Sequence, residues 1–266
     1  MTDVESLVRS GRLLEGRTVV VSGAGRARGI GKATARLFVE HGARVAMLDL
    51  DEAEVREAAA DVAAGSAATL AVRCDVTRME SCRSAIEQVL AWSGSAGRID
   101  VLVNNAGVTQ KRPVAEITPE DYTLITDVTL RGTMQLAQAV IPVMRAQRSG
   151  SIVNISSMSA LQGGGVYGGA HYCAAKAGVL GLTRALAREL GPDGIRANAI
   201  TPGLIVTDFS RSGTPDEAKH AMGQAWPLQR AGSPVEIGGV CLFLASDLSS
   251  YVTGITLDVN GGAYMR

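Results

Sequence analysis

The stretch VSGAGRARGIG, residues 21–31, places four glycines and two arginines directly behind an apolar run. Glycines at this spacing let a chain turn sharply and let its backbone approach a pyrophosphate, which then meets the N-terminus of the next helix. The same spacing also suits a plain tight turn between a strand and a helix. The rest of the sequence must therefore decide between a phosphate cradle and a turn, and must say which phosphate, if any, the arginines hold.

The composition bounds the class of protein. A chain of 266 residues that is 46% hydrophobic and 20% charged can bury the core of one large α/β domain or of two small ones. A formal net charge of +0 gives no indication of the excess positive charge that binding to nucleic acid or an anionic membrane would need. No apolar run approaches the roughly 20 residues that span a bilayer, and the first residues lack the apolar core of a signal peptide. We expect a cytoplasmic protein with no nucleic-acid or membrane partner.

The four cysteines show neither C-x-x-C pairing nor the spacing of metal ligands. They lie among apolar or helical residues, which is typical of reduced, structural thiols. We therefore expect no metal site. These cysteines are Cys74, Cys82, Cys173 and Cys241.

Seven short apolar runs alternate with amphipathic segments along the whole chain. Because the runs are nearly continuous in apolar residues, both of their faces should be buried, as in a parallel sheet covered by helices. The alternation predicts one doubly wound α/β (Rossmann) domain, with a seven-stranded, mostly parallel sheet and helices on both faces. The runs are 17–23, 43–50, 68–75, 99–107, 150–157, 194–201 and 254–262.

Helix starts are readable in two places. Thr118 offers a hydroxyl N-cap followed by a proline and two acids, and Ser233 repeats the device as a capping box. We expect Pro142 to bend or end the long helix that Thr118 starts.

No linker divides the chain. We expect residues 1–14 to form a loosely attached lead-in and residues 15–266 to form a single catalytic domain. The segment 203–232 is rich in glycine and proline, breaks the strand–helix alternation and is a candidate mobile flap over a substrate site.

Asp49 supports the nucleotide interpretation of the glycine stretch. It ends the second predicted strand, 18 residues after Gly31. A carboxylate there can accept hydrogen bonds from the adenosine ribose and would repel a 2′-phosphate. Alone, Asp49 could equally cap the next helix. Combined with Gly23, Gly29 and Gly31 in one βαβ unit, it favours a dinucleotide site.

Tyr172 and Lys176 lie four residues apart on the predicted helix 171–190, and so share one helix face. Such a pair is often only a solvated surface. An ammonium at about 4 Å would, however, stabilise a phenolate by about 4 kcal/mol and lower the tyrosine pKa by about three units. Tyr172 could then act as a general acid/base. Ser157 follows a buried strand and could bind the same substrate oxygen, or merely cap a turn.

Together these residues resemble the short-chain dehydrogenase/reductase family, from about Leu14 to the C-terminus. No single motif is specific, but their order and spacing make a chance match very improbable. The resemblance rests on Ser22-Gly23…Gly29-Ile30-Gly31, Asp49, Cys74-Asp75-Val76, Asn104-Asn105-Ala106-Gly107, Ser157, Tyr172-x-x-x-Lys176, Pro202-Gly203 with Thr207, and Tyr251-Val252-Thr253-Gly254.

The resemblance implies a mechanism. Tyr172 would exchange a proton with the substrate while a hydride passes to or from a nicotinamide, Ser157 would steady the reacting oxygen, and Lys176 would hold the nicotinamide ribose. It also implies a homotetramer formed through the helices near 118–145 and 170–190 and the last strand. The cofactor contacts, besides Tyr172 and Lys176, would be Gly23, Arg28, Gly29, Ile30, Gly31, Asp49, Asp75, Val76, Asn104, Ala106, Gly107, Pro202, Gly203, Ile205 and Thr207.

Three features depart from the family pattern. Five residues, not the usual three, separate Gly23 from Gly29, so the loop must bulge. Thr129 stands where the family commonly has an asparagine that supports a proton-relay water, so we expect an altered relay. Tyr172 follows Ser157 by 15 residues, about two more than usual. The added length makes three residues candidate substrate contacts: Gln162, Tyr167 and His171.

Arg28 stands where NADP-dependent relatives often carry a basic residue, but it could equally pair with Asp49 or face solvent. Asp49 favours NAD, and hence a reaction run mainly as oxidation. The leading hypothesis is an NAD-dependent dehydrogenase acting on a small polar, polyol-like or sugar-like secondary alcohol. One alternative is an NADP(H)-dependent 3-oxoacyl-thioester reductase, and another is a non-catalytic nucleotide-binding regulator. The thioester alternative would draw on basic residues at the entrance: Lys111, Arg112, Arg131 and Arg148.

Overall fold

The computed structural model describes residues 11–93, 97–164, 167–209 and 214–265. Within these ranges, seven strands form one sheet of order β3-β2-β1-β4-β5-β6-β7, and every neighbouring pair is parallel. The predicted seven-stranded doubly wound sheet is confirmed, and its described strands are all parallel. The strands are β1 (Thr18–Ser22), β2 (Arg44–Asp49), β3 (Thr69–Arg73), β4 (Val101–Asn104), β5 (Gly150–Ile155), β6 (Ile195–Pro202) and β7 (Thr256–Val259).

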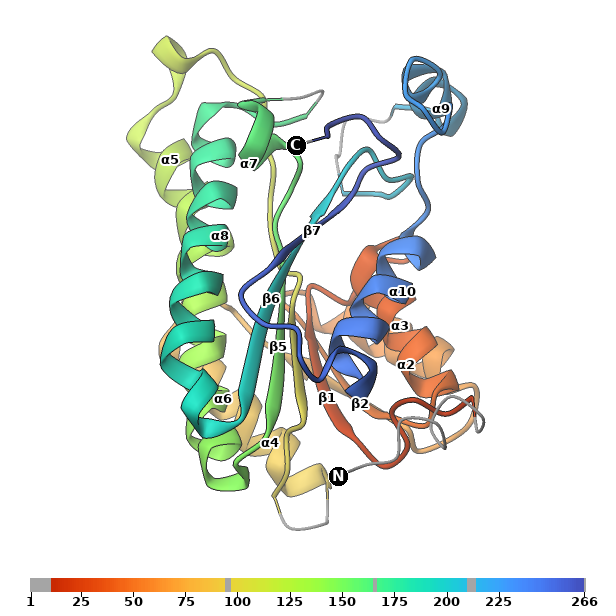
Figure 1. Ribbon diagram of the computed structural model, residues 1–266, viewed down its shortest axis with the longest axis vertical. Helices are drawn as coiled ribbons and strands as arrows, with labels where there is room; N and C mark the ends of the chain where they lie inside the picture. The colour runs from red at the N-terminus through yellow and green to blue at the C-terminus, as the bar shows by residue number, and fades with distance from the viewer. Residues whose placement is uncertain (1–10, 94–96, 165–166, 210–213, 266) are drawn as a thin grey trace.

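The central strands β1, β4, β5 and β6 are buried at almost every position because both faces of the sheet are covered (Figure 1). Successive side chains of a strand point to opposite faces. On β1, Val19 and Val21 pack into one core, whereas Val20 packs into the other. This arrangement explains why the strands read as continuous apolar runs.

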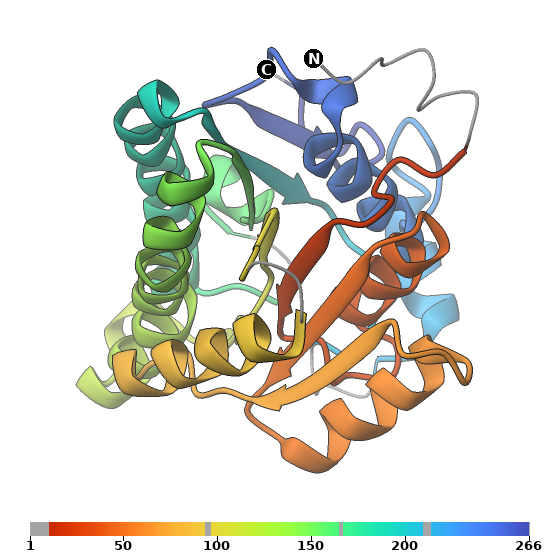
Figure 2. The same ribbon diagram turned by 90° about the horizontal axis from the view of Figure 1, so that it is seen from below.

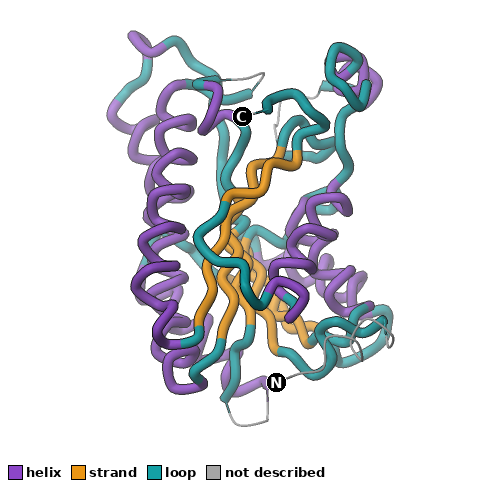
Figure 3. The backbone as a smooth tube through the Cα atoms, in the orientation of Figure 1, coloured by secondary structure: helices purple, strands orange, loops and turns teal. Residues whose placement is uncertain are grey.

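The helices form the two outer layers, with the strands between them (Figure 3). Helices α2 (Ile30–Glu40), α3 (Glu52–Ala63) and α10 (Pro234–Ala245) cover one face, and their core includes Phe38, Val55 and Cys241. Helices α4 (Met79–Ser93), α6 (Gly132–Gln147) and α8 (Ala170–Leu190) cover the other. The shorter helices are η1 (Val114–Glu116), α5 (Pro119–Thr126), η2 (Asp127–Arg131), α7 (Ser159–Gln162), η3 (Gly191–Asp193), α9 (Asp216–Gly223) and η4 (Asp247–Ser249).

The predicted helix starts are present, since Thr118 and Ser233 both form capping boxes. The expectation that Pro142 could end its helix is wrong, because α6 runs on to Gln147. Val140 and Met144 are fully buried on either side of the proline, so core packing supports the turn that lacks one hydrogen bond. The irregularity in this helix lies earlier, at the π-helical turn η2.

The sheet order reverses at β1, whose neighbours are β2 and β4. Figure 2 shows the strands fanning apart between the two helical layers. In such sheets, ligands bind beyond the carboxyl ends of the strands at the point where the order reverses. The topology therefore directs attention to the loops after β1 and β4.

Two segments singled out in the sequence are partly described by the structure. Leu14, the last residue of the expected lead-in, is fully buried in the core, and its N–H donates to the carbonyl of His41 at 3.0 Å. Residues 1–10 lie outside the described ranges. In the segment 203–232, Ile205 pairs with Gly232 as an isolated β-bridge, with α9 between them. Residues 210–213 of this segment also lie outside the described ranges.

Candidate active site

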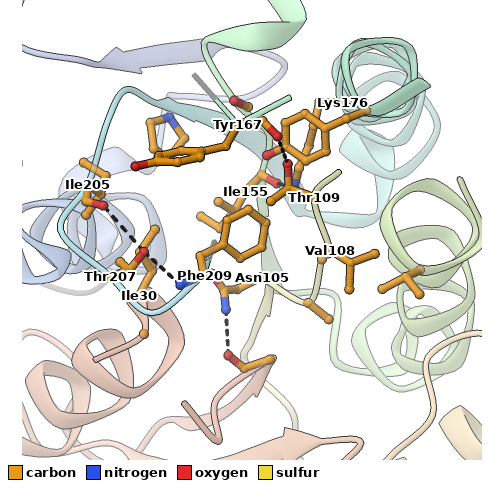
Figure 4. Close-up of a pocket in the computed structure, with 18 of the residues that line it drawn as sticks. Ile30, Asn105, Val108, Thr109, Ile155, Tyr167, Lys176, Ile205, Thr207 and Phe209 are labelled. Atoms are coloured by element: carbon orange, nitrogen blue, oxygen red, sulfur yellow. Dashed lines mark hydrogen bonds between the residues drawn. The ribbon is translucent and has the colours of Figure 1, made fainter. Parts of the chain in front are cut away.

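A cavity of about 650 Å³ opens at the carboxyl edge of the sheet, among the loops that follow the strands. Figure 4 shows part of its lining, drawn from several loops and from α8. The predicted site residues that line it are Gly23, Gly29, Ile30, Asp49, Asp75, Val76, Ala106, Gly107, Ser157, Tyr172, Lys176, Pro202, Gly203, Ile205 and Thr207.

The N-terminus of α2 opens into this cavity without a side-chain cap. Its N-cap residue, Gly29, makes no side-chain hydrogen bond, the first turn holds no acidic residue, and Gly29 and Ile30 both line the cavity. Uncapped N–H groups and the positive end of the helix dipole favour an anion. Gly23, with a φ of +65°, allows the turn that brings the backbone to this point. These features fit the pyrophosphate of a dinucleotide.

Asp49 organises the enlarged glycine loop. One of its carboxylate oxygens accepts the N–H of Gly25 at 2.8 Å, and the other accepts the N–H of Leu50 at 2.8 Å. The additional residues thus arch back to the end of β2. The neighbouring Asp51, not Asp49, caps α3 by accepting from the N–H groups of Ala53 and Glu54. The helix-cap interpretation therefore belongs to Asp51, and Asp49 lies at the cavity.

Gly31 and Asn104, two predicted cofactor contacts, do not line the cavity. A Cβ on Gly31 would lie 2.5 Å from the carbonyl oxygen of Gly23, so this glycine serves the close packing of α2 on the loop. The Asn104 amide is buried and donates to the side chain of Asn154 at 2.9 Å. Both residues therefore support the elements around the cavity without lining it.

Arg28 lies outside the cavity lining as well, and its partners differ from those considered from the sequence. Its N–H donates to Asp208 at 3.2 Å, and its guanidinium forms an ion pair with Asp216. Both acids belong to the segment 203–232. Arg28 thus joins the glycine loop to this segment and does not pair with Asp49.

Ser157, Tyr172 and Lys176 meet in the cavity. The buried Lys176 ammonium donates to the carbonyl of Ile155 at 2.7 Å and lies 5.9 Å from the centroid of the Tyr172 ring. The Ser157 hydroxyl, which accepts the N–H of Ser159 at 3.1 Å, acts on the phenol of Tyr172 to lower its pKa. A proton-transfer group, a second hydroxyl and a cation are therefore gathered at one point.

The expected lowering of the Tyr172 pKa by Lys176 is not found. Burial raises the pKa of Tyr172 to about 12, against the opposing effect of the Ser157 hydroxyl. Burial also lowers the pKa of Lys176 to about 8. The expectation assumed an ammonium at about 4 Å and an effective dielectric constant of about 20. Here the Lys176 ammonium is engaged by the carbonyl of Ile155, and burial of both groups penalises their charged forms.

Thr129 is fully buried on the π-helical turn η2, which packs against α8. Its hydroxyl has no hydrogen-bond partner among the described residues. Its carbonyl accepts the hydroxyl of Thr133 at 2.7 Å. The residue does not line the cavity itself.

Several residues that line the cavity could not be identified from the sequence. Arg26, Asp51 and Glu54 line the end near β2, and no sequence motif distinguishes them from ordinary charged residues of a solvated surface. Phe209 and Trp226 line the other end. The only pointer to these two was their place in the segment 203–232. The Phe209 ring centroid lies 6.5 Å from that of Tyr172.

Of the three candidate substrate contacts, Gln162 and Tyr167 line the cavity and His171 does not. The buried His171 ring bonds through Nε2 to the side-chain oxygen of Gln110 at 2.9 Å. Desolvation lowers the pKa of His171, and its role is to join α8 to the loop after β4.

The four cysteines are free and buried, as expected for structural thiols. In the described parts of the chain, no group of three or more His, Cys, Asp or Glu residues could hold a metal ion. Across the same residues, every helix is too short or too polar to traverse a bilayer.

Known proteins share both the sequence and the fold. Residues 23–264 match the family described as Enoyl-(Acyl carrier protein) reductase. The chain is 49% identical to an uncharacterised short-chain type dehydrogenase/reductase of Sinorhizobium fredii, over 94% of this chain and 98% of that protein. It is 39% identical to a 3-oxoacyl-(acyl-carrier-protein) reductase of Thermotoga maritima, with 94% and 98% covered.

A crystal structure of a short-chain type dehydrogenase/reductase from Mycobacterium marinum superimposes with a TM-score of 0.86 at 34% identity, covering 95% of this chain and 97% of that one. Family, relatives and fold agree with the Tyr172–Lys176 constellation and the glycine loop at the cavity. The chain therefore belongs to the short-chain dehydrogenase/reductase family and is an oxidoreductase dependent on a nicotinamide cofactor.

Proposed function

We propose that this enzyme interconverts a secondary alcohol and its ketone with NAD, acting on a small polar, polyol-like or sugar-like substrate. The observation that carries the proposal is that one cavity joins Ser157, Tyr172 and Lys176 to an adenosine end lined by Asp49. The first three residues would carry out proton transfer to and from the substrate, and the Asp49 carboxylate would favour NAD over NADP.

The chain's own groups would divide the work. The Tyr172 hydroxyl exchanges a proton with the substrate oxygen, and the Ser157 hydroxyl bonds the same oxygen. Lys176 places a positive charge beside them and binds the nicotinamide ribose. When bound, the oxidised nicotinamide accepts the hydride and adds positive charge to the site. Burial raises the pKa of Tyr172 to about 12, so phenolate formation would depend on the positive charge that Lys176 places beside it.

Acidic side chains at the adenosine end support NAD. Asp49, Asp51 and Glu54 line this end together, with Arg26 as the one cation of the described lining there. A 2′-phosphate would carry its negative charge to within reach of these carboxylates. Arg28, which could have compensated, is paired with Asp208 and Asp216.

A second candidate is NADP(H)-dependent reduction of a 3-oxoacyl thioester, favoured by the names of several relatives. The basic residues that could bind such a substrate give this candidate little support, because two of them are already engaged in ion pairs. Arg112 pairs with Asp121 at 2.9 Å, and Arg131 pairs with Asp127 at 3.1 Å. Arg148 follows α6 and precedes β5, so it lies at the opposite edge of the sheet and cannot serve the entrance.

Three further features complete the proposal. The buried, unpaired hydroxyl of Thr129 would take part in a proton relay near Lys176. The exposed small residues Ala174, Ala177 and Gly181 on α8 suit close helix packing in a homotetramer, which light scattering would refute by a monomeric mass. Reduced, buried thiols favour the cytoplasm as its compartment.

The proposal is tested by turnover. Diols, sugar alcohols, hydroxy acids and a 3-oxoacyl thioester are assayed with NAD and with NADP, for the native enzyme, Tyr172→Phe and Asp49→Ala. We expect alcohol oxidation with NAD, its loss in Tyr172→Phe, and weaker NAD binding in Asp49→Ala. A preference for NADP with the thioester would establish the second candidate, and nucleotide binding without any turnover would establish the regulator.

A further inference from the structure

Tyr167 lies in the segment between Ser157 and Tyr172 that is longer than the family pattern. It lines the cavity, and its phenol oxygen is buried with no hydrogen-bond partner among the described residues. Buried polar atoms are nearly always paired, and an unpaired one costs roughly 1–3 kcal/mol. A phenol in this position at a ligand cavity is therefore a candidate for pairing with a ligand.

The backbone around Tyr167 is held in place by the loop after β4. The Thr109 hydroxyl donates to the carbonyl of Tyr167 at 2.7 Å, and the N–H of Gly169 donates to the carbonyl of Gln110 at 2.8 Å. The Gln110 side chain is itself fixed between His171 and Asp121, at 2.9 Å and 2.7 Å. Two loops are thus joined into one wall of the cavity.

This wall also touches the catalytic tyrosine. A Cβ on Gly168 would lie 2.6 Å from Cδ1 of Tyr172, so only a glycine allows the wall to approach the ring this closely. Tyr167 is the adjacent residue. The backbone of Tyr167 is therefore held beside Tyr172, and both side chains line the same cavity, as a specificity residue requires.

The remaining substrate-side lining mixes apolar side chains with uncharged polar ones and carries little charge. Figure 4 shows Tyr167 beside Thr109, with Val108, Ile205 and Phe209 elsewhere in the same lining. The Gln162 amide already donates to the carbonyl of Gly164 at 2.9 Å. In the described lining, the charged side chains other than Lys176 all come from the glycine loop, the β2–α3 region and the end of β3. The walls around Tyr167 thus suit an uncharged substrate.

We propose that Tyr167 determines specificity by donating its phenol O–H to a second, uncharged oxygen of the substrate. The inference rests on the proposed function and narrows it: the substrate is an uncharged secondary alcohol or ketone with a hydroxyl or carbonyl oxygen near the reacting carbon. A site built to bond such an oxygen disfavours the analogue that lacks it.

The test compares matched alcohols in matched variants. Values of kcat/KM are measured for butane-2,3-diol and butan-2-ol, for cyclohexane-1,2-diol and cyclohexanol, and for lactate, in the native enzyme, Tyr167→Phe and Tyr251→Phe. Tyr251 is fully exposed and serves as the control. We expect the preference for diol over mono-alcohol to fall roughly 10-fold in Tyr167→Phe and to stay unchanged in Tyr251→Phe.

Three results would overturn the inference while leaving the proposed function intact. These are an equal loss for diols and mono-alcohols in Tyr167→Phe, a native enzyme that prefers mono-alcohols, and a native enzyme that prefers the anionic lactate. Failure of the proposed function is recognised separately, by full activity in Tyr172→Phe or by no turnover of any alcohol or ketone.

Discussion

Replacing Gly168 by alanine should disable the enzyme through one methyl group. The added Cβ would lie 2.6 Å from Cδ1 and 3.2 Å from Cε1 of Tyr172. Ordinary carbon contacts are about 3.5–4.0 Å, so the Tyr172 ring or the loop must move by about 1 Å. The loop is tied down by the bond between Gly169 and Gln110 at 2.8 Å, and Tyr172 belongs to α8. We therefore expect the Tyr172 ring, and not the loop, to move.

A displacement of about 1 Å at a reacting group costs about 100-fold in rate, and overpacking destabilises by about 1–3 kcal/mol. We expect kcat/KM with the best alcohol to fall by about 100-fold while NAD still quenches tryptophan fluorescence. Gly239→Ala is the control. Gly239 is exposed on α10 with no atom within 4 Å of an added Cβ. The free energy of unfolding of that variant should therefore rise by about 0.5–1 kcal/mol, and its activity should be unchanged. Activity of Gly168→Ala within threefold of the native value would refute the reasoning.

Three further predictions concern pH and buried polar groups. The kcat/KM for alcohol oxidation should rise with pH between about 6 and 8, because burial raises the pKa of Tyr172 to about 12 and the phenolate fraction grows throughout that range. The rise should level off above about pH 8, because burial lowers the pKa of Lys176 to about 8 and its positive charge is lost there. A flat or falling profile between about pH 6 and 8 would contradict this. Thr129→Val should raise the free energy of unfolding by about 1 kcal/mol, since it removes a buried, unpaired hydroxyl, and should lower kcat if the hydroxyl serves a relay; a lower melting temperature would count against it. Glu236→Gln should lower stability by about 1 kcal/mol at neutral pH, because Arg230 and the N–H of Ser233 lower the pKa of Glu236 to about 2. Stability from a lowered carboxylate pKa is present above its unfolded value and lost as pH falls toward 2, so urea titrations should show the difference shrinking below about pH 4.

Periodicity located the strands but not where each one ends. The run 99–107 predicts a strand, and only Val101–Asn104 is paired. The next residues form the cavity wall, where the Asn105 amide donates to the carbonyl of Gly23 at 2.9 Å. An apolar run marks burial, and burial continues past the last ladder bond.

The sequence shows where the chain departs from the family pattern but not what the departure does in the fold. The two extra residues of the glycine loop are visible in the sequence. Only the fold shows that the loop returns to Asp49 through the N–H of Gly25. The π-helical turn at Asp127–Arg131 has no signature in the sequence, and only the fold shows that it packs against α8.

By itself, the sequence determined the doubly wound sheet and the set of residues at its carboxyl edge, including Ser157, Tyr172 and Lys176. Local periodicity specifies strands and helices, and the carboxyl ends of parallel strands must share one edge. The tertiary structure alone decided the electrostatics. Arg28 meets Asp208 across 180 residues of sequence, and the pKa of Tyr172 is raised because burial removes it from water while Lys176 bonds to a carbonyl. Charge interactions depend on distance and dielectric in three dimensions, and neither is encoded in the spacing of residues along the chain.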